Sequence, residues 1–227
     1  MTALGFRSDA QRVPVFGLGC AGGVTGLSLA ARLAAADPGR KVLFVCLELC
    51  TLSFRLDRPS KADIVATALF GDGAAACVLQ AGAEGFAQLV GAAEHTWPDT
   101  LDIMGWRVDP EGLGVIFAQA IPPFARKNLG PAMDAMLGRQ GLGRGDVDRF
   151  LCHPGGTKVI EALEATLGLG QGDLDHERQV LADHGNMSAP TALFVLERAR
   201  RAGLPRRSVL TALGPGFTAS AVTLMAA

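Results

Sequence analysis

Cys20 is the first side chain in this sequence that could do chemistry, because it stands among the five glycines of GLGCAGGVTGL (17–27). A glycine-rich turn lets backbone or a ligand approach where a side chain would block it. The cysteine also stands where an apolar run gives way to a helical pattern, and the N–H groups of a helix N-terminus stabilise a thiolate and lower its pKa. Cys20 is therefore a candidate nucleophile, with a buried structural thiol as the alternative.

A thiolate needs a partner that holds its charge and moves its proton, and the chain has four histidines. His153 follows the apolar segment RFLC and precedes PGG, which places it at the C-terminal end of a strand, where open α/β sheets bind ligands. His95 and His176 stand in polar segments typical of solvated side chains, and His184 is expected to face away from its turn. His153 is therefore the predicted base.

Asn186 offers a third polar group, in HGNMSAP just before an amphipathic helix. Taken alone, it is typical of a helix cap or a turn. With Cys20 and His153 it forms a set of three turn-borne groups from separate parts of the chain. The amide N–H2 group and an imidazole N–H can together stabilise an enolate or oxyanion, which favours thioester chemistry.

Strands and helices that could position these groups are mixed along the chain. Short strands are predicted at 13–19, 41–49, 74–80, 89–94, 113–118, 149–154, 208–213 and 218–224. The segment 41–49 is apolar enough for a central strand covered on both faces. Helices are predicted over 27–34, 159–167 and 192–199, and another follows the prolines of IPPF and ends near Gly141. The order predicts a layered α/β sheet.

Other glycine-rich segments have simpler interpretations. LFGDGAAA (69–76) is typical of a hairpin or tight turn, with Asp72 bonded to backbone. GPGF (214–217) links the last two strands and is functional only if it lies near the site. GLGCAGG lacks the spacing and the acidic strand end of a dinucleotide fingerprint, so a Rossmann site is excluded. The long segment 94–112 is expected to be an irregular loop that walls a pocket.

Composition limits the function classes. The 227 residues are 49% hydrophobic and 19% charged, which suits one domain or two closely packed halves. A formal net charge of -1 gives no footprint for nucleic acid, so small-molecule partners are expected. No apolar run is long enough for a membrane span and no signal peptide is recognised, so the expected location is cytoplasmic. The five cysteines have no metal-ligand spacing and predict no disulfide scaffold.

Five ordered motifs resemble one family. GLGCAGG, LFGDGAAA, HPGG, GNMSAP and the terminal GPGF occur in this order in the type III polyketide synthases, the chalcone and stilbene synthase family of the thiolase superfamily. The resemblance implies a layered αβαβα fold that here lacks the N-terminal part of its first half. It divides the chain into residues 1–95, the remainder of the half that carries the nucleophile, and residues 96–227, the C-terminal half.

The resemblance also implies a reaction. Cys20 would take an acyl group from an acyl-CoA starter, and His153 with Asn186 would polarise malonyl-CoA so that loss of carbon dioxide gives an enolate. The enolate would then attack the Cys20 thioester, and cyclisation would release a pyrone or resorcinol-type product. The family implies no cofactor and no metal, and a homodimer in the full-length form.

Pocket residues carry over from the same resemblance. Phe70 matches a gatekeeping phenylalanine, and Val115 is interpreted as the second gatekeeping position, where a smaller side chain leaves more room. Together with DIMGWRV (102–108), this favours a fatty acyl starter. The other matching wall or turn positions are Cys50, Ser53, Gly105, Gly155, Gly156, Ser188, Gly214, Pro215 and Gly216.

The chain departs from the family in length, since family members are substantially longer and this sequence begins shortly before Cys20. We therefore expect a fragment of a longer enzyme, with sheet edges and apolar faces left uncovered. The alternatives are a catalytically silent remnant that pairs with a full-length subunit, a thioesterase that hydrolyses the acyl-Cys20 intermediate, and a condensing enzyme like ketoacyl-ACP synthase III.

Overall fold

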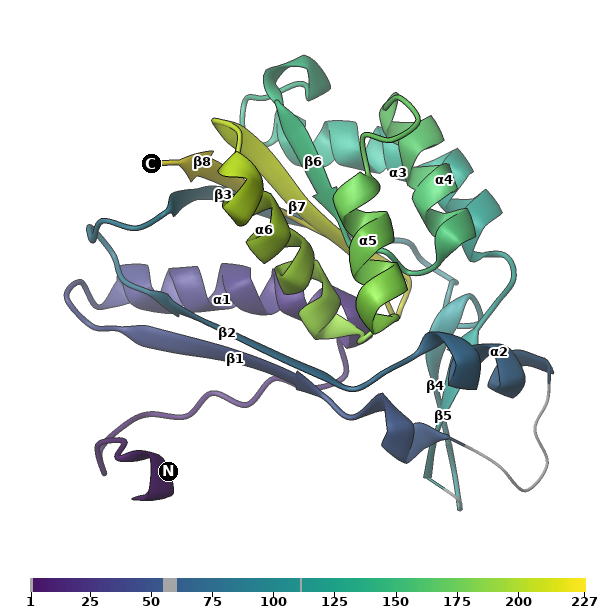
Figure 1. Ribbon diagram of the computed structural model, residues 1–227, viewed down its shortest axis with the longest axis horizontal. Coiled ribbons are helices and arrows are strands. Elements are labelled where there is room, and N and C mark those ends of the chain that lie inside the picture. Colours follow the sequence, from purple (N-terminus) through teal and green to yellow (C-terminus); the bar gives the residue numbers. More distant parts are fainter. Residues whose placement is uncertain (1, 55–60, 111) are drawn as a thin grey trace.

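Strands and helices are mixed along the chain in the computed structural model, which describes residues 2–54, 61–110 and 112–227 (Figure 1). The strands are β1 (Val42–Glu48), β2 (Gly73–Leu79), β3 (Ala87–Thr96), β4 (Met104–Asp109), β5 (Gly112–Phe117), β6 (Arg149–Cys152), β7 (Arg207–Gly214) and β8 (Thr218–Ala226). The α-helices are α1 (Gly22–Ala36), α2 (Lys61–Leu69), α3 (Ile121–Gly138), α4 (Thr157–Leu167), α5 (Asp175–His184) and α6 (Ala189–Gly203). The predicted α/β class is confirmed.

The central sheet has four strands in the order β3-β8-β7-β6. Strand β6 runs parallel to β7, whereas β7 and β3 both run antiparallel to β8. A parallel pair needs a crossover connection, and here α4, α5 and α6 supply it between β6 and β7. Strand β6 therefore lies at one edge of this sheet, and its carboxyl end leads directly into His153.

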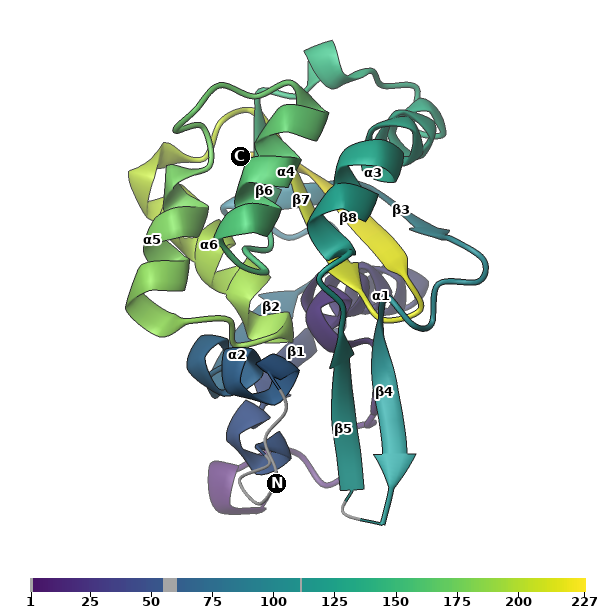
Figure 2. The ribbon, with the colours of Figure 1, turned by 90° about the vertical axis from the view of Figure 1, so that its right-hand side faces the viewer.

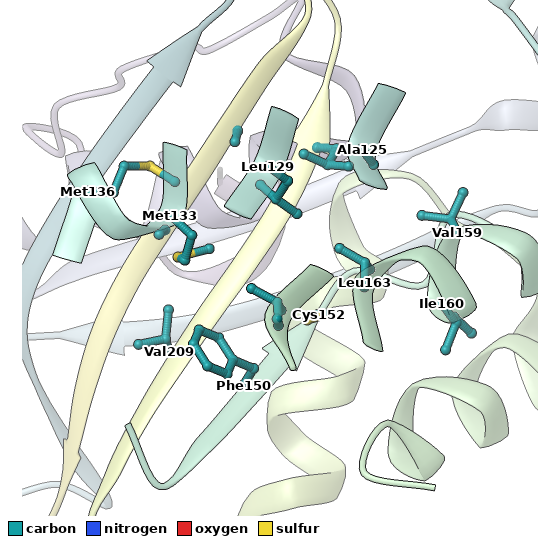
Figure 3. Close-up of a cluster of buried hydrophobic side chains, with 14 of the residues drawn as sticks. Ala125, Leu129, Met133, Met136, Phe150, Cys152, Val159, Ile160, Leu163 and Val209 are labelled. Atoms are coloured by element: carbon teal, nitrogen blue, oxygen red, sulfur yellow. The ribbon is translucent and has the colours of Figure 1, made fainter. Parts of the chain in front are cut away.

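Helices α3 and α4 cover one face of the central sheet. Leu129 and Met133 of α3 and Leu163 of α4 are buried in one cluster with Phe150 of β6 (Figure 3). These positions recur every three or four residues, so each helix turns a single apolar face toward the strands. Within the described residues, none of the helices has the length and apolar character that a membrane span requires.

Helices α1, α5 and α6 cover the opposite face, and the small sheet β1-β2 packs against α1 and α6 in turn. The order of layers is therefore helices, sheet, helices, sheet. Val24 of α1, Leu196 of α6 and Cys46 of β1 are buried in the cluster that fills this side. The order of layers matches the expected layered fold over the part of the chain that the structure describes.

The outer face of β1-β2 is open. Leu43, Val45 and Leu47 are 44%, 57% and 62% exposed, and they alternate with inward residues such as Cys46. The prediction that this strand is covered on both faces is wrong, because α1 and α6 pack on one side only. The expectation of an uncovered apolar face is confirmed here.

The apolar segment 13–19 does not form the strand that was predicted. Val13, Val15 and Phe16 are exposed, and no described strand pairs with this segment. It runs past the open side of β1-β2 toward the N-terminus (Figure 1). An apolar run becomes a strand only where a neighbour completes its hydrogen bonds, and this run has none among the described residues.

The segment 94–112 contains more regular structure than was expected. Strand β3 continues to Thr96, and β4 pairs with β5 in a hairpin that projects away from the central sheet (Figure 2). Residue 111 lies outside the described residues. Helices α2 and α5 were not predicted. In α5, the few apolar positions form no periodic pattern that would reveal a helix.

Helix α3 begins earlier than predicted. The prolines of IPPF lie in its first turn, where a missing N–H costs no hydrogen bond, rather than before the helix. It ends at Gly138 instead of near Gly141, because the chain turns with a bond from the Gly141 N–H to the Gly138 carbonyl.

Candidate active site

Cys20 lies in a 3₁₀ turn (Gly19–Ala21) that leads into α1, and its side chain is 6% exposed. The neighbouring glycines are explained by close approaches. A Cβ at Gly19 would lie 2.8 Å from Pro215 Cδ, and one at Gly23 would lie 2.3 Å from the Ala189 carbonyl oxygen. The glycine-rich turn therefore lets the GPG turn and the start of α6 close around the cysteine, as its composition predicted.

The GPG turn contributes to the site mainly through its backbone. Pro215 lines the pocket that contains Cys20, whereas Gly214 and Gly216 do not line it. A Cβ at Gly214 would lie 2.5 Å from the Ala21 Cβ, so this glycine allows the two turns to touch. The turn does lie near the site, which is the condition on which its functional interpretation depended.

Asn186 is fully buried beside Cys20. Its Oδ1 accepts the Ser188 N–H at 2.8 Å and lies 4.0 Å from the Cys20 Sγ, and its Nδ2 donates to the Gly155 carbonyl at 3.4 Å. The bond that Oδ1 accepts from the Ser188 N–H is the local bond expected of an asparagine in a turn. It fixes the orientation of an amide that also faces the sulfur.

The backbone of Asn186 is joined to the segment that carries Phe70. The Asn186 N–H donates to the Leu69 carbonyl at 2.8 Å, and the Gly71 N–H donates to the Asn186 carbonyl at 3.0 Å. This parallel bridge holds the backbone of Asn186 beside that of Phe70, which lines the main pocket, whereas Asn186 lines neither pocket.

His153 follows β6, and its imidazole is 4% exposed. Neither Nδ1 nor Nε2 has a hydrogen-bond partner among the described residues. Burial lowers the pKa of His153 to about 4. The imidazole and Cys20 line one small inner pocket, together with Met104, Phe117, Ile121, Gly155, Val159 and Leu213.

The pKa of Cys20 differs from the expectation. The pKa of its thiol is raised to about 11, mainly by burial, with smaller effects from Ser188, which lowers it, Glu48, which raises it, and Asn186, which lowers it. The predicted lowering at the helix end is wrong for this state because the sulfur is almost fully removed from solvent. The resting pair is a neutral thiol and a neutral imidazole. The imidazole can then accept the thiol proton as the sulfur attacks.

A larger main pocket opens from Cys20. The predicted residues that line it are Cys20, Cys50, Ser53, Phe70, Gly105, Val115, Ser188 and Pro215. Gly155 lines the inner pocket instead, and Gly156 lines neither but precedes α4 as its N-cap. Gly105 and its neighbours belong to the segment 94–112, so the prediction that this segment walls a pocket is confirmed.

Phe117 was missed by the sequence reasoning. It lines both pockets, and its ring meets that of Phe70 edge to face. Val115, interpreted as the second gatekeeping position, lies two residues earlier on β5 and lines only the main pocket. Alternate residues of a strand share a face, so the pattern VIF could have pointed to Phe117 as well as Val115.

Glu48 was also missed. It ends β1 and lines the main pocket, where its Oε1 accepts a bond from the Ser188 Oγ at 3.4 Å. Burial raises the pKa of this carboxyl. An acidic residue that closes an otherwise apolar strand was the available signal.

The remaining candidates lie elsewhere. His95 packs edge to face with Trp97, and the exposed His184 packs with Phe194. Asp72 accepts the Thr51 N–H at 2.9 Å, which confirms its predicted bond to backbone.

Comparisons with known proteins agree along the whole chain. The family described as chalcone and stilbene synthases, N-terminal domain, matches residues 1–83, and the corresponding C-terminal domain family matches residues 88–226. Among curated relatives, the 1,3,6,8-tetrahydroxynaphthalene synthase of Streptomyces peucetius subsp. caesius is 39% identical over 97% of this chain and 60% of its own length. The 3,5-dihydroxyphenylacetyl-CoA synthase of Streptomyces toyocaensis is 33% identical over 95% of this chain and 58% of its own length.

Solved structures show the same fold. The 1,3,6,8-tetrahydroxynaphthalene synthase of Streptomyces coelicolor A3(2), a bacterial type III polyketide synthase, matches with a TM-score of 0.91 at 27% identity, over 99% of this chain and 65% of its own. The C-terminal type III polyketide synthase domain of Steely1 from Dictyostelium matches with a TM-score of 0.90 at 28% identity, over 99% of this chain and 64% of its own. The chain thus spans less than two thirds of each of these four proteins.

Proposed function

Since this chain belongs to the chalcone and stilbene synthase family, we propose that it catalyses decarboxylative condensation of an acyl-CoA starter with malonyl-CoA. One observation carries the proposal: a thiol, an imidazole and an amide from three distant points of the chain meet at one site. The Asn186 Oδ1 lies 4.0 Å from the Cys20 Sγ, and His153 lines the inner pocket with Cys20.

The first step loads the cysteine. The Cys20 Sγ attacks the thioester carbonyl while its proton passes to the unpartnered imidazole of His153. The carbon–sulfur bond to CoA then breaks, and the departing thiolate takes the proton from the imidazolium. The products are acyl-Cys20 and free CoA, and His153 returns to its neutral form.

The second step forms the new carbon–carbon bond. Loss of carbon dioxide from malonyl-CoA leaves an electron pair that becomes an enolate, whose oxygen accepts N–H bonds from Asn186 and His153. The enolate carbon attacks the Cys20 thioester carbonyl, and the sulfur leaves as a thiolate. Ser188 favours that thiolate by lowering the pKa of Cys20.

We propose a fatty acyl group as the starter and a pyrone or resorcinol-type molecule as the product. The main pocket supports this, because apolar side chains such as Leu49, Phe54 and Val115 line it beside Cys20. The edge-to-face pair of Phe70 and Phe117 weakens the argument that Val115 leaves extra room. The similarity to the 1,3,6,8-tetrahydroxynaphthalene synthase of Streptomyces peucetius subsp. caesius supports a second candidate product, a polyhydroxylated naphthalene.

Mass spectrometry of the intact protein tests the proposal. Incubation with fatty acyl-CoAs of increasing chain length is expected to add one acyl group, which peptide mapping places on Cys20 and which the C20A variant lacks. Malonyl-CoA should then release carbon dioxide and extend the chain, and the mass of the released product separates the two candidates. Free fatty acid without carbon dioxide would indicate a thioesterase, and the absence of any adduct would indicate a silent subunit.

We also propose that the protein forms a homodimer. Measurement of its molar mass by light scattering tests this proposal.

A further inference from the structure

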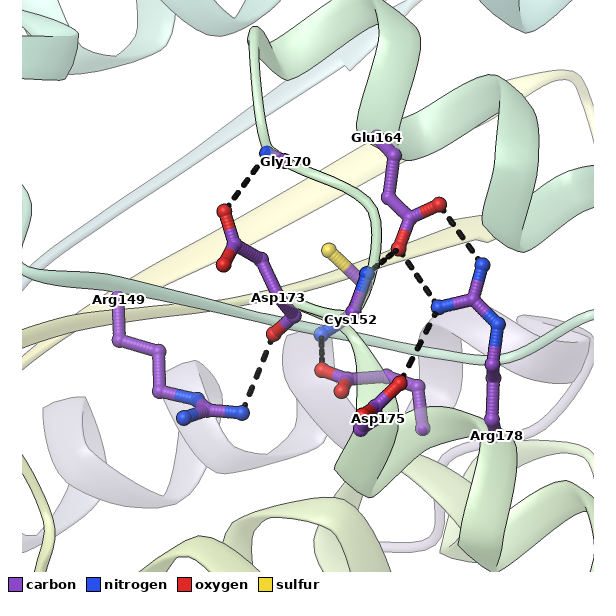
Figure 4. A network of polar contacts seen from close by, with 9 residues as sticks. Arg149, Cys152, Glu164, Gly170, Asp173, Asp175 and Arg178 are labelled. Atoms are coloured by element: carbon purple, nitrogen blue, oxygen red, sulfur yellow. Dashed lines mark hydrogen bonds and ion pairs between the residues drawn. The ribbon is translucent and has the colours of Figure 1, made fainter.

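Glu177 is a buried carboxyl that the proposed reaction does not use. It lies on α5 with 0% of its surface exposed. Its Oε1 accepts the backbone N–H of Cys152 at 2.8 Å, the contact drawn to the Cys152 nitrogen in Figure 4. A buried carboxyl is costly unless it makes such bonds, and this contact satisfies Oε1, whereas Oε2 has no hydrogen-bond partner among the described residues.

The bond completes an open edge of the central sheet. Strand β6 pairs with β7 on one side only, and N–H groups of successive residues point to opposite sides of a strand. The His153 N–H donates to the Thr211 carbonyl of β7 at 2.8 Å. The preceding N–H, that of Cys152, points the other way and meets Glu177. Two consecutive backbone bonds therefore hold the end of β6 from both sides.

The position of the His153 ring depends on this backbone. Neither ring nitrogen is hydrogen-bonded within the described residues, so no polar contact of the side chain orients the imidazole. Its place is set by the end of β6 and by the apolar walls of the inner pocket. A shift of the Cys152 backbone would carry the imidazole with it.

We propose that Glu177 is a positioning residue for His153: by accepting the Cys152 N–H, it fixes the end of β6 so that the imidazole faces Cys20. This role rests on the proposed function, in which His153 takes the proton of Cys20. Glu177 contacts neither pocket, so it acts through the backbone and not on the substrate.

The Glu177 carboxyl does not have to be ionised to accept the Cys152 N–H, as the groups around it show. Arg149 of β6 donates to the Asp173 carbonyl at 3.2 Å, and its Nε lacks a hydrogen-bond partner among the described residues. Arg178 of α5 is held by Glu164 of α4 at 2.6 Å. Burial raises the pKa of Glu177 to about 7, against smaller opposing effects of the Cys152 N–H and both arginines. The neutral and the charged carboxyl both offer an acceptor oxygen at Oε1, as a glutamine would.

Three substitutions at position 177 separate the acceptor from the charge. E177Q keeps an acceptor of the same length, E177M fills the space without an acceptor, and E177D keeps the carboxylate but draws it back by one methylene. E164Q is the matched control, because it removes a nearby carboxyl, 7% exposed, that bonds Arg178 rather than β6. Melting temperatures identify any variant that fails to fold.

Two readouts test the role. The first is the NMR signal of the His153 imidazole in ¹³C,¹⁵N-histidine-labelled protein, assigned with H153Q. The second is the kcat and KM of malonyl-CoA decarboxylation. E177M and E177D are expected to shift the imidazole signal and to lower kcat about 10- to 100-fold with little change in KM, because misplacement of a catalytic group by about 1 Å has effects of this size. E177Q and E164Q are expected to keep the wild-type signal and kcat.

The outcomes are distinct. A wild-type imidazole signal in a folded E177M or E177D variant would overturn the positioning role, and so would an E177Q variant that shifts the signal as far as E177M. If E177M does not fold, E177D and E177Q still decide the question. The NMR readout needs no turnover, so an inactive wild-type protein would refute the proposed function while leaving this test intact.

Discussion

The rings of Phe70 and Phe117 meet edge to face beside Cys20, with 5.7 Å between their centroids and 85° between their planes. Phe70 directly follows α2 and Phe117 ends β5, so two separate segments meet in the lining of the main pocket. Such pairs contribute about 0.5–1.5 kcal/mol beyond the area they bury. The pair therefore stabilises the wall of the pocket that Cys20 also lines.

Replacing Phe117 by alanine is expected to widen both pockets and shift starter preference toward bulkier acyl groups. V115A is the control, because Val115 lies on the same strand but does not touch the inner pocket. The measurement is the ratio of adducts formed on Cys20 from short and long acyl-CoAs in competition. An unchanged ratio in F117A would show that this ring does not limit the starter.

Replacing His153 by glutamine is expected to raise the pH at which Cys20 becomes reactive. Burial is the main cause that raises the pKa of the Cys20 thiol to about 11, and in the proposed reaction the neutral imidazole of His153, which lines the same inner pocket, takes the thiol proton. The pH dependence of iodoacetamide alkylation, followed by mass at the Cys20 peptide, measures the shift. Identical profiles for the wild type and H153Q would argue against proton transfer between these two side chains.

Stability is expected to respond to pH in opposite directions at two buried groups. Burial raises the pKa of Glu177 from 4.5 to about 7, so the folded chain binds this proton more tightly and the free energy of unfolding falls as pH rises through that range. Burial lowers the pKa of His153 from 6.5 to about 4, so there the unfolded chain binds the proton and the free energy of unfolding rises with pH.

Single variants should separate the two contributions. Between about pH 4.5 and 6.5, E177Q is expected to show a steeper rise in the free energy of unfolding than the wild type, and H153Q is expected to show a fall. Each group contributes at most about 1.4 kcal/mol per pH unit. Urea titrations at several pH values measure these slopes, and parallel slopes for all three proteins would contradict the two shifts.

Gly23→Ala is expected to destabilise the fold by about 1–3 kcal/mol, because the added Cβ would lie 2.3 Å from the Ala189 carbonyl oxygen. Gly138→Ala is the matched control near the end of another helix, where no atom lies within 4 Å of the new Cβ. That change is expected to be neutral or to stabilise by up to about 1 kcal/mol. Urea unfolding of both variants measures the difference, and equal midpoints would contradict the close approach.

The convergence of Cys20, His153 and Asn186 was predictable because each stands at a turn next to a strongly patterned element. Glycines beside Cys20 and His153 and the helix after Asn186 located these turns. The central strands β6, β7 and β8 were predictable for the same reason, since their apolar runs are short and bounded by turn residues.

Other features depended on contacts that sequence patterns do not contain. The segment 13–19 has the composition of a strand but no described partner, and the raised pKa of Cys20 follows from burial by distant segments. Helix α5 escaped prediction because only two of its residues, Val180 and Leu181, are aliphatic and large. Its residue Glu177 is of a type that is usually exposed, and only the three-dimensional fold shows that it is buried.

The parallel bridge joins Phe70, which lines the main pocket, to Asn186, which faces the Cys20 sulfur, so the two residues with different roles in the proposed function share one piece of backbone. Its two backbone bonds run from the Asn186 N–H to the Leu69 carbonyl and from the Gly71 N–H to the Asn186 carbonyl, so a change in the backbone around Phe70 is expected to move Asn186 as well. A substitution at Phe70 that broadens the product range is therefore expected to change kcat as well. Changes on β5, which lines the main pocket through Val115 and Phe117 and has no such backbone bridge to Asn186 in the part of the chain described, are expected to alter the pocket with less effect on Asn186.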